Sequence, residues 1–216
     1  NSKNFEISNI KLNILKGQKI GIIGPSASGK STVIEILTGI SEPTQGSVMV
    51  DGKSIFSNIK GWQKLTGLVP QKIFILDGSL RDNILFGLDK KKYTDDQIIS
   101  LIKKINLENL LRRLIGGLDG NLSEKGINLS GGEIQRIGLC RALIYDPEVL
   151  FLDEATSSLD INTESQILNE LQIFKEKTII SIAHRINTLK NCDTIYRFDN
   201  GKVVDQGDFD KFKTQN

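Results

Sequence analysis

Apolar positions along the chain follow two spacings, one typical of buried strands and one typical of helices. Residues 19–23 form a short, nearly continuous apolar run, as in a parallel strand covered on both faces. Over residues 33–40 the apolar side chains recur at helical spacing. Strand patterns return at residues 149–152 and 178–183, with a helical pattern over about 162–174 between them. Because strands alternate with helices, the sequence predicts an α/β fold with a mostly parallel sheet.

Polar turns and one long helical stretch interrupt this alternation. Residues 10–14 alternate between apolar and polar side chains, which predicts a half-solvated strand. Asp51-Gly52 and Asn200-Gly201 separate short apolar segments and are typical of hairpin turns. In the helical stretch, Thr94-Asp95-Asp96-Gln97 has the pattern of a capping box. We therefore expect an N-terminal antiparallel β subdomain and an inserted helical subdomain at about residues 72–145.

The bulk composition excludes several classes of protein. With 28 basic and 26 acidic residues, the formal charge of +2 gives no signal for nucleic-acid binding. Cys140 and Cys192 are too few and too far apart in sequence for a metal cluster or a disulfide framework. The apolar runs are far shorter than the ~20 residues of a membrane-spanning helix. No signal peptide is visible, and the first residue is Asn1. We therefore expect an excised, soluble, cytosolic domain.

A phosphate-binding motif follows the first buried strand. Residues 24–31, GPSASGKS, fit the pattern G-x-x-x-x-G-K-[ST] between an apolar strand and a helix, which is the context of a P-loop. Small residues let successive backbone N–H groups face the phosphates, and the helix dipole adds partial positive charge. Lys30 supplies a full charge, and Ser31 offers a hydroxyl to Mg²⁺. We expect a bound polyphosphate to contact Gly24, Pro25, Ser26, Ala27, Ser28, Gly29, Lys30, Ser31 and Thr32.

Two carboxylates close the strand pattern at residues 149–152. Successive side chains along a strand point to opposite faces, so Asp153 and Glu154 are expected to have different roles. Asp153 is placed to hold Mg²⁺ through water, and Glu154 can orient or deprotonate an attacking water. The alternative is an acid pair that merely faces solvent at a strand end. The P-loop and the apolar run before Asp153 disfavour that alternative.

His184, the single histidine of the sequence, ends the apolar run 178–183. A lone histidine at a strand end is more often a hydrogen-bonded structural group. Here we expect its strand to lie beside the strand of Asp153, with its carboxyl end toward the crevice where nucleotides bind. We therefore expect His184 to contact the γ-phosphate, and Lys30, Glu154 and His184 are the candidate catalytic residues.

The segment Leu129-Ser130-Gly131-Gly132-Glu133 opens a further helical pattern. A Ser-Gly-Gly helix start can bind an anion. The same residues can equally form a loop-capped helix. Spacing alone does not decide between the two.

Taken together, these residues resemble the ATP-binding domain of ABC transporters over nearly the whole chain. The resemblance implies that residues 129–133 are the family's signature, which closes over the γ-phosphate of ATP bound by a second copy. It also implies that Gln71 is the Q-loop glutamine, which contacts Mg²⁺ and the attacking water. The implied metal residues are then Ser31, Gln71 and Asp153. Ser157-Ser158-Leu159-Asp160 is similar to the D-loop that crosses the dimer interface, and His184 matches the switch histidine.

Two further stretches resemble exporters in particular. Residues 74–84 look like the segment that follows the Q-loop, and residues 121–126 look like the exporter X-loop, with Ser123 where glycine is usual. Other positions depart from the family. Ala27 stands where glycine is common, and we expect binding to survive. Glu133 replaces the usual glutamine, and its charge near a triphosphate is expected to affect dimer affinity more than chemistry.

The sequence thus predicts a P-loop NTPase core that forms the nucleotide-binding domain of an ABC exporter, with ATP and Mg²⁺ as cofactors. The family's adenine-stacking aromatic lies upstream of Asn1, so we expect the N-terminal strand and this A-loop to be missing. The expected partners are a second nucleotide-binding domain, homodimer or heterodimer, and a transmembrane domain N-terminal in the same polypeptide. The expected location is the cytoplasmic face of the inner membrane, and no nucleic acid is expected. A soluble ABC-type ATPase of assembly or repair is the alternative, and the exporter-like stretches favour transport. The transported substrate is chosen outside this domain.

Overall fold

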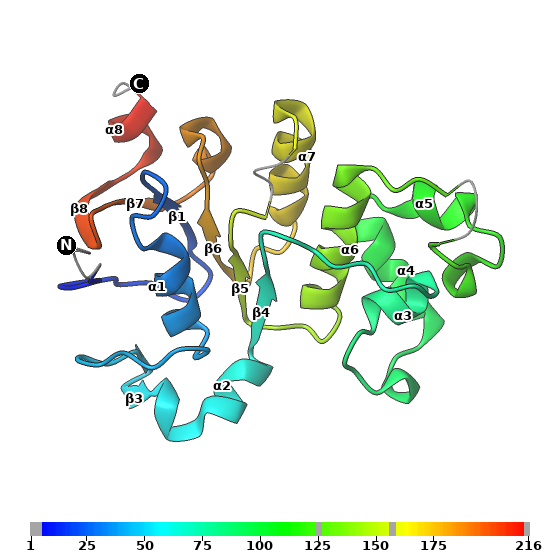
Figure 1. Cartoon of the computed structure of the whole chain (residues 1–216), viewed down its shortest axis with the longest axis horizontal. Coiled ribbons are helices and arrows are strands. Elements are labelled where there is room, and N and C mark those ends of the chain that lie inside the picture. The colour runs from blue at the N-terminus through cyan, green and yellow to red at the C-terminus, as the bar shows by residue number, and fades with distance from the viewer. Residues whose placement is uncertain (1–5, 124–126, 156–158, 214–216) are drawn as a thin grey trace, which may run out of the picture. The chain divides into compact units, whose positions relative to one another are not determined.

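The structure, a computed structural model, describes residues 6–123, 127–155 and 159–213. It divides into two compact units, which are described separately below. The first unit comprises Asn1–Leu68, Pro147–Glu154 and Glu176–Asn216, and the second comprises Val69–Asp146 and Ala155–Lys175. Figure 1 shows the helices and strands with the labels used here.

The first unit is built around a sheet that has six strands among the described residues, in the order β4-β5-β6-β1-β7-β8. β5 pairs parallel with β6, β6 with β1 and β1 with β7, and β8 pairs antiparallel with β7. The strands are β1 (Lys19–Ile23), β4 (Thr66–Val69), β5 (Val149–Leu152), β6 (Thr178–Ile182), β7 (Thr194–Asp199) and β8 (Lys202–Gly207). The predicted α/β fold with a mostly parallel sheet is therefore confirmed.

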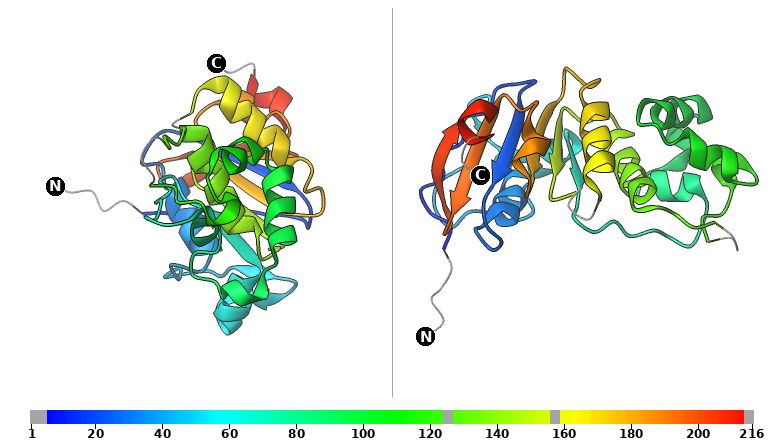
Figure 2. Two further views of the ribbon diagram at one scale, coloured as in Figure 1. Left: turned by 90° about the vertical axis from the view of Figure 1, so that its right-hand side faces the viewer. Right: turned by 90° about the horizontal axis from the view of Figure 1, so that it is seen from above.

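Both faces of β1 are covered, which explains its unbroken apolar run. Ile20 and Ile22 pack with Val33 and Ile34 of helix α1 (Lys30–Leu37) on one face. On the other face, Ile23 packs in a cluster with residues of the 3-10 turn η4 (Ile186–Leu189) and of helix α8 (Phe209–Lys213). Figure 2 shows α1 and α8 on opposite sides of the sheet. Because side chains alternate along a strand, every residue of β1 is buried by one of these layers.

The N-terminal part of this unit contains the predicted hairpin but not the predicted strand at residues 10–14. β2 (Met49–Val50) and β3 (Lys53–Ser54) pair antiparallel, followed by η1 (Ile55–Asn58) and helix α2 (Ile59–Lys64). Residues 6–15 form no strand. Their alternation is nevertheless real, because Ile10, Leu12 and Ile14 pack on the core of the sheet. Alternation reports which side chains are buried, and here the backbone bonds to a side chain instead: Asn13 N–H donates to the Tyr196 hydroxyl.

The second unit is mostly helical. Its α-helices are α3 (Leu80–Ile84), α4 (Asp95–Lys104), α5 (Glu108–Arg113), α6 (Gly131–Leu143) and α7 (Ile161–Leu171), with 3-10 turns η2 (Lys90–Lys92) and η3 (Gly117–Asp119). The capping box predicted at the start of α4 is present: Thr94 and Gln97 exchange side-chain-to-backbone hydrogen bonds. α4 buries Ile98, Leu101 and Ile102, as its helical spacing predicts.

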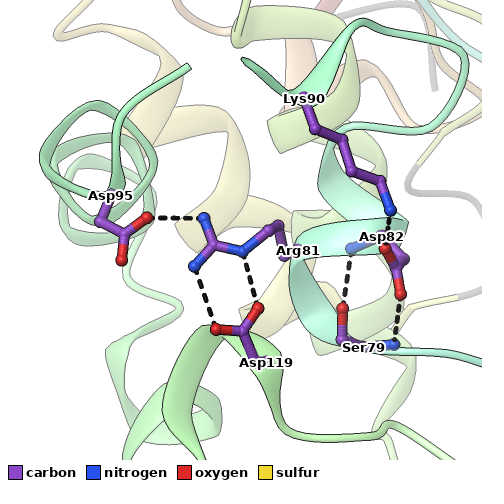
Figure 3. A network of polar contacts seen from close by, with 6 residues as sticks. All are labelled: Ser79, Arg81, Asp82, Lys90, Asp95 and Asp119. Carbon is purple, nitrogen blue, oxygen red and sulfur yellow. Dashed lines mark hydrogen bonds and ion pairs between the residues drawn. The ribbon is translucent and has the colours of Figure 1, made fainter. Parts of the chain in front are cut away.

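A network of charged side chains fixes the start of α3 within this unit (Figure 3). Arg81 donates two hydrogen bonds to the carboxylate of Asp119, at 2.7 and 3.2 Å, and one to Asp95 at 2.6 Å. Asp82 pairs with Lys90 and forms a capping box with Ser79. The Lys90 and Ser79 hydrogen bonds lower the pKa of Asp82 to about 2. One short helix is thus tied by charge to η2, η3 and the first turn of α4.

Candidate active site

The loop between β1 and α1 has the shape that a phosphate requires. Gly24 has a φ of +152°, and a Cβ there would lie 2.2 Å from the carbonyl oxygen of Phe198, so no other residue fits. Gly29, in the left-handed conformation at φ +98°, is the N-cap of α1 and offers no side-chain cap. The first N–H groups of α1 are therefore left to an anion. The buried hydroxyl of Ser28, for which the described residues provide no hydrogen-bond partner, also fits a phosphate oxygen.

Lys30 starts α1 and turns its buried ammonium group back into this loop. Its Nζ donates to the carbonyl oxygens of Gly24 at 3.0 Å and Pro25 at 2.8 Å. Burial lowers the pKa of Lys30, and the nearby carboxylates of Glu154 and Asp153 oppose that effect. A desolvated cation of this kind interacts strongly with an incoming phosphate.

Glu154 lies between Lys30 and His184. Its Oε1 atom is 4.0 Å from Lys30 Nζ and 2.8 Å from His184 Nε2. The Glu154 side chain is 13% exposed, whereas His184 is 39% exposed and can reach a ligand. The structure therefore brings together the three residues that the sequence singled out for catalysis, and it shows that His184 also contacts the candidate base. No pattern in the sequence indicated that contact.

Ser31 and Asp153 are joined directly. The Ser31 hydroxyl donates to Asp153 Oδ1 at 2.9 Å. Burial raises the pKa of Asp153, and the hydrogen bond from Ser31 opposes this shift. A hydroxyl and a carboxylate are hard oxygen ligands of the kind that Mg²⁺ takes together with substrate phosphates and water. These two residues fit the metal site that the sequence predicts.

The remaining P-loop residues differ in exposure. Pro25, Ser26 and Ala27 are exposed at the tip of the loop, and Ser31 and Thr32 are exposed at the start of α1. Ala27 has a φ of +60°, in the left-handed region that favours glycine. This is the position where the resemblance expects glycine, and the loop adopts the left-handed turn there although alanine carries a Cβ.

Gln71 belongs to the second unit, where it is exposed. The metal shell that it is expected to share with Ser31 and Asp153 stays a prediction. Residues 124–126 of the predicted X-loop, and Ser157 and Ser158 of the predicted D-loop, lie outside the described residues.

The segment at residues 129–133 starts helix α6 as a capped helix, and its binding of an anion stays a prediction. Ser130 is the N-cap, and it forms a capping box with Glu133. Gly131 and Gly132 pass close to Leu159 of the predicted D-loop and to Thr163 of α7, because a Cβ at either glycine would come within about 3.0 Å of those side chains. The sequence contains the S-x-x-E pattern of a capping box at residues 130–133. This pattern is the signal that could have predicted the contact between Ser130 and Glu133.

The predicted D-loop residue Asp160 caps α7. Its carboxylate accepts hydrogen bonds from the backbone N–H groups of Asn162 at 3.1 Å and Thr163 at 3.0 Å. Bonds from Thr163, foremost among the causes, lower the pKa of Asp160. The contact across a dimer interface that the resemblance implies for this residue stays a prediction.

Comparison with known proteins decides the family. A family model described as ABC transporter matches residues 7–157. The chain belongs to the ABC transporter family. It is 39% identical over 200 residues to the ABC multidrug transporter mdr1 of Aspergillus fumigatus, which covers 92% of this chain and 15% of that protein. It is 38% identical over 201 residues to ABC transporter B family member 17 of Arabidopsis thaliana, which covers 92% of this chain and 16% of that protein.

Its fold is similar to the structure of a bacterial Atm1-family ABC exporter with ATP bound. The TM-score is 0.82 at 32% sequence identity, over 94% of this chain and 36% of the exporter chain. The predicted family and fold are therefore confirmed, and membership of the ABC transporter family implies ATP binding. None of the described helices is both long enough and apolar enough to cross a membrane.

Proposed function

We propose that this chain is the ATP-hydrolysing domain of an ABC exporter. The observation that carries this proposal is the group formed by Lys30, Glu154 and His184, with Glu154 within 4.0 Å of the lysine and 2.8 Å of the histidine. The names of the similar proteins support export rather than a soluble role. In this proposal, the domain pairs with a second copy, and an attached transmembrane domain N-terminal in the same polypeptide moves the substrate at the cytoplasmic face of a membrane.

Each side chain has a distinct part in hydrolysis. The P-loop backbone and Lys30 hold the β- and γ-phosphates and neutralise their charge. Ser31 and Asp153, with Gln71 as the expected third residue, hold Mg²⁺, which would supply charge neutralisation to the phosphates. Glu154 accepts the proton of a water that attacks the γ-phosphorus in line with the departing ADP oxygen. His184 donates to the γ-phosphate as charge develops on it.

The second copy completes the site. Its residues 129–133 approach the γ-phosphate from the opposite side, with Asp160 at the same interface. ATP then holds the two copies together, and hydrolysis separates them, which converts the chemical step into motion of the attached domain. A signature that contributes only in trans makes hydrolysis depend on pairing.

The test is the rate of ATP hydrolysis as a function of protein concentration, for the wild-type chain and for Glu154→Gln. Glu148→Gln is the matched control, because Glu148 is an exposed carboxylate of the same unit that pairs with Lys16. We expect the wild-type and Glu148→Gln rates to rise faster than linearly with concentration. We expect Glu154→Gln to bind ATP, to lose turnover by about 10²-fold or more, and to accumulate as an ATP-bound dimer.

Two outcomes would contradict the proposal. Wild-type turnover in Glu154→Gln would show that another group is the base. A rate strictly proportional to protein concentration, with no ATP-dependent dimer of Glu154→Gln, would show that the site is complete within one copy.

A further inference from the structure

The signature of this chain contains a carboxylate that is already bonded on both of its oxygens. Glu133 Oε2 accepts hydrogen bonds from the Ser130 N–H at 2.9 Å and from the Ser130 hydroxyl at 3.0 Å. Its other oxygen, Oε1, forms an ion pair at 3.0 Å with Nη2 of Arg113, the last residue of α5. The Glu133 side chain is only 15% exposed, and the Arg113 side chain is 50% exposed. A guanidinium thus connects α5 to the first turn of α6 through one carboxylate.

This arrangement bears on the proposed function because the Ser130 hydroxyl has one proton to donate. That proton is directed at Glu133, so a γ-phosphate oxygen must compete with Glu133 for it. When the hydroxyl turns to a phosphate, Glu133 loses a hydrogen bond at a site that is mostly shielded from water. A shielded carboxylate held only by the Ser130 N–H is costly unless a cation compensates its charge, and next to a triphosphate it also repels the ligand.

We propose that Arg113 is a positioning residue of the signature, which acts through Glu133. It holds Oε1 and neutralises the carboxylate, so that Ser130 can exchange Glu133 for the γ-phosphate of the partner's ATP while Glu133 keeps a charged partner. This inference rests on the proposed function, since it concerns how the signature accepts the nucleotide of a second copy. It makes a glutamate acceptable at a position where the family uses glutamine.

The neighbouring arginines are engaged elsewhere. Arg136 donates to the Ile105 carbonyl at 2.9 Å and to both oxygens of the Glu170 carboxylate, at 3.2 and 2.8 Å. Arg112 points at Glu108 on its own helix, 3.7 Å away, with a side chain that is 75% exposed. Arg113 is therefore the arginine of this group that compensates Glu133. Arg112, adjacent in sequence and equal in charge, is the matched control.

The carboxylate and the arginine depend on each other. Ser130 and Arg113 contact opposite oxygens of Glu133, so a glutamine at position 133 that turns its oxygen to Ser130 presents its NH₂ group, another donor, to the guanidinium. With glutamine at this position, Arg113 has no charge to compensate. The effect of removing Arg113 is therefore large when residue 133 is glutamate and small when it is glutamine.

The test measures the ATP concentration that gives half-maximal dimer in the Glu154→Gln chain, by analytical ultracentrifugation. Into this background we introduce Arg113→Ala, Arg112→Ala, Glu133→Gln and the pair Arg113→Ala with Glu133→Gln. We expect Arg113→Ala to raise the required ATP concentration roughly tenfold, since compensation of one shielded charge is lost. Arg112→Ala is expected to stay within about twofold, as is usual for an exposed helix pair. Adding Glu133→Gln to Arg113→Ala is expected to restore the parent value to within about twofold.

Two readouts separate this inference from a structural effect. The thermal midpoint and the affinity of the monomer for ATP report on folding and on the P-loop, and we expect both to be the same in all variants. A merely structural ion pair would change the thermal midpoint, and Glu133→Gln would not restore dimer formation.

Each outcome decides one question. If the Glu154→Gln chain forms no ATP-dependent dimer, the proposed function fails before this inference is reached. If it dimerises but Arg113→Ala behaves like Arg112→Ala, the inference is wrong. If Arg113→Ala weakens dimerisation equally with glutamate and with glutamine at position 133, the inference is also wrong, because Arg113 then acts on the phosphate directly.

Discussion

Two residues of the candidate site carry side chains in backbone conformations that favour glycine. Ala27 in the P-loop has a φ of +60°, and Glu154 has a φ of +49°. A non-glycine residue in this region costs roughly 1–2 kcal/mol. Such costs are typical of functional sites, where the surrounding structure holds a side chain in a required direction. For Glu154 the direction is toward His184, whereas the exposed Ala27 has no polar side chain to direct.

Ala27→Gly is therefore expected to stabilise the chain, by about 0.5–1 kcal/mol, because relief of the left-handed strain exceeds the added entropy of the unfolded state. Urea unfolding measures the change. The matched control is Ala142→Gly, in the regular backbone of α6, which is expected to destabilise by about 1 kcal/mol or more. A loss of stability in Ala27→Gly would show that the loop strain is absent in solution.

At the residue scale the sequence predicted identities better than contacts. Lys30, Glu154 and His184 could be selected because each follows a strand or loop whose pattern is local. The contact between Glu154 and His184 was not predictable, since it depends on a backbone turn at Glu154 that a charged residue rarely adopts. The ion pair of Arg113 with Glu133 was missed for another reason. The two residues lie on different helices, and no repeating spacing in the sequence indicates which residues of two helices come into contact.

At the element scale, the short helix α3 is held by two buried apolar side chains, Leu80 and Ile84, together with a set of charged contacts. With five residues, α3 is too short to be stable alone. Arg81 ties it to Asp119 and Asp95, and Ser79 with Asp82 caps its first turn. The chain on either side is also held, because Ser79 pairs with Asn121 in an isolated antiparallel bridge. The segment that resembles exporters thus keeps its shape through polar contacts at its ends as well as through burial of Leu80 and Ile84.

The capping box of α3 gives a pH dependence with a definite sign. Asp82 has a folded-state pKa of about 2, below its ordinary value of 3.8. Its contribution to stability is therefore present above about pH 4 and is lost as the pH falls toward 2. We expect Asp82→Asn to be less stable than wild type at pH 6, and we expect the difference to shrink as the pH falls from about 4 to 2. Chemical unfolding at several pH values measures this, with Asp96→Asn in the first turn of α4 as control.

Elements were predictable where the pattern was local, and the exceptions are instructive. The capping box at Thr94 and the helical spacing of α4 lie within a few residues of each other, and both are present. The alternation at residues 10–14 predicted a strand and gave none. Every second side chain of a segment can pack on a core while its backbone N–H and C=O groups bond to something other than a neighbouring strand. Periodicity alone therefore does not determine whether a segment joins a β-sheet.

At the scale of the whole molecule, strand order was only partly predictable. The sequence placed β6 beside β5, and these strands pair in parallel, with Phe151 opposite Ile180. The position of β1 between β6 and β7 had no signal in the sequence, because buried parallel strands all show the same apolar run. Strand order depends on how the faces of strands and helices far apart in the sequence pack together, and no short stretch of sequence contains that information.

Nucleotide binding is expected to stabilise the whole folded chain through Lys30. A ligand at 100 times its Kd adds about 2.7 kcal/mol to the free energy of unfolding, which raises the midpoint of a domain of this size by roughly 5–10 °C. Thermal unfolding with and without Mg-ATP measures the shift. Lys30→Ala is expected to abolish it, and Lys16→Ala, an exposed lysine that pairs with Glu148, is expected to keep it. A full shift in Lys30→Ala would refute the role of this lysine.

The place of β1 in the sheet has a consequence for folding during synthesis on the ribosome. The strand that leads into the P-loop pairs Lys19 with Ile179 and Ile20 with Thr194. A ribosome therefore makes this apolar strand first and its two neighbours roughly 160 residues later, after about 10–30 s of synthesis at ordinary speed. During that interval α1 is available to cover one face of β1, but both strands that pair with its edges are still missing. The edges of this strand therefore stay without their native hydrogen-bond partners until nearly the whole chain has been made.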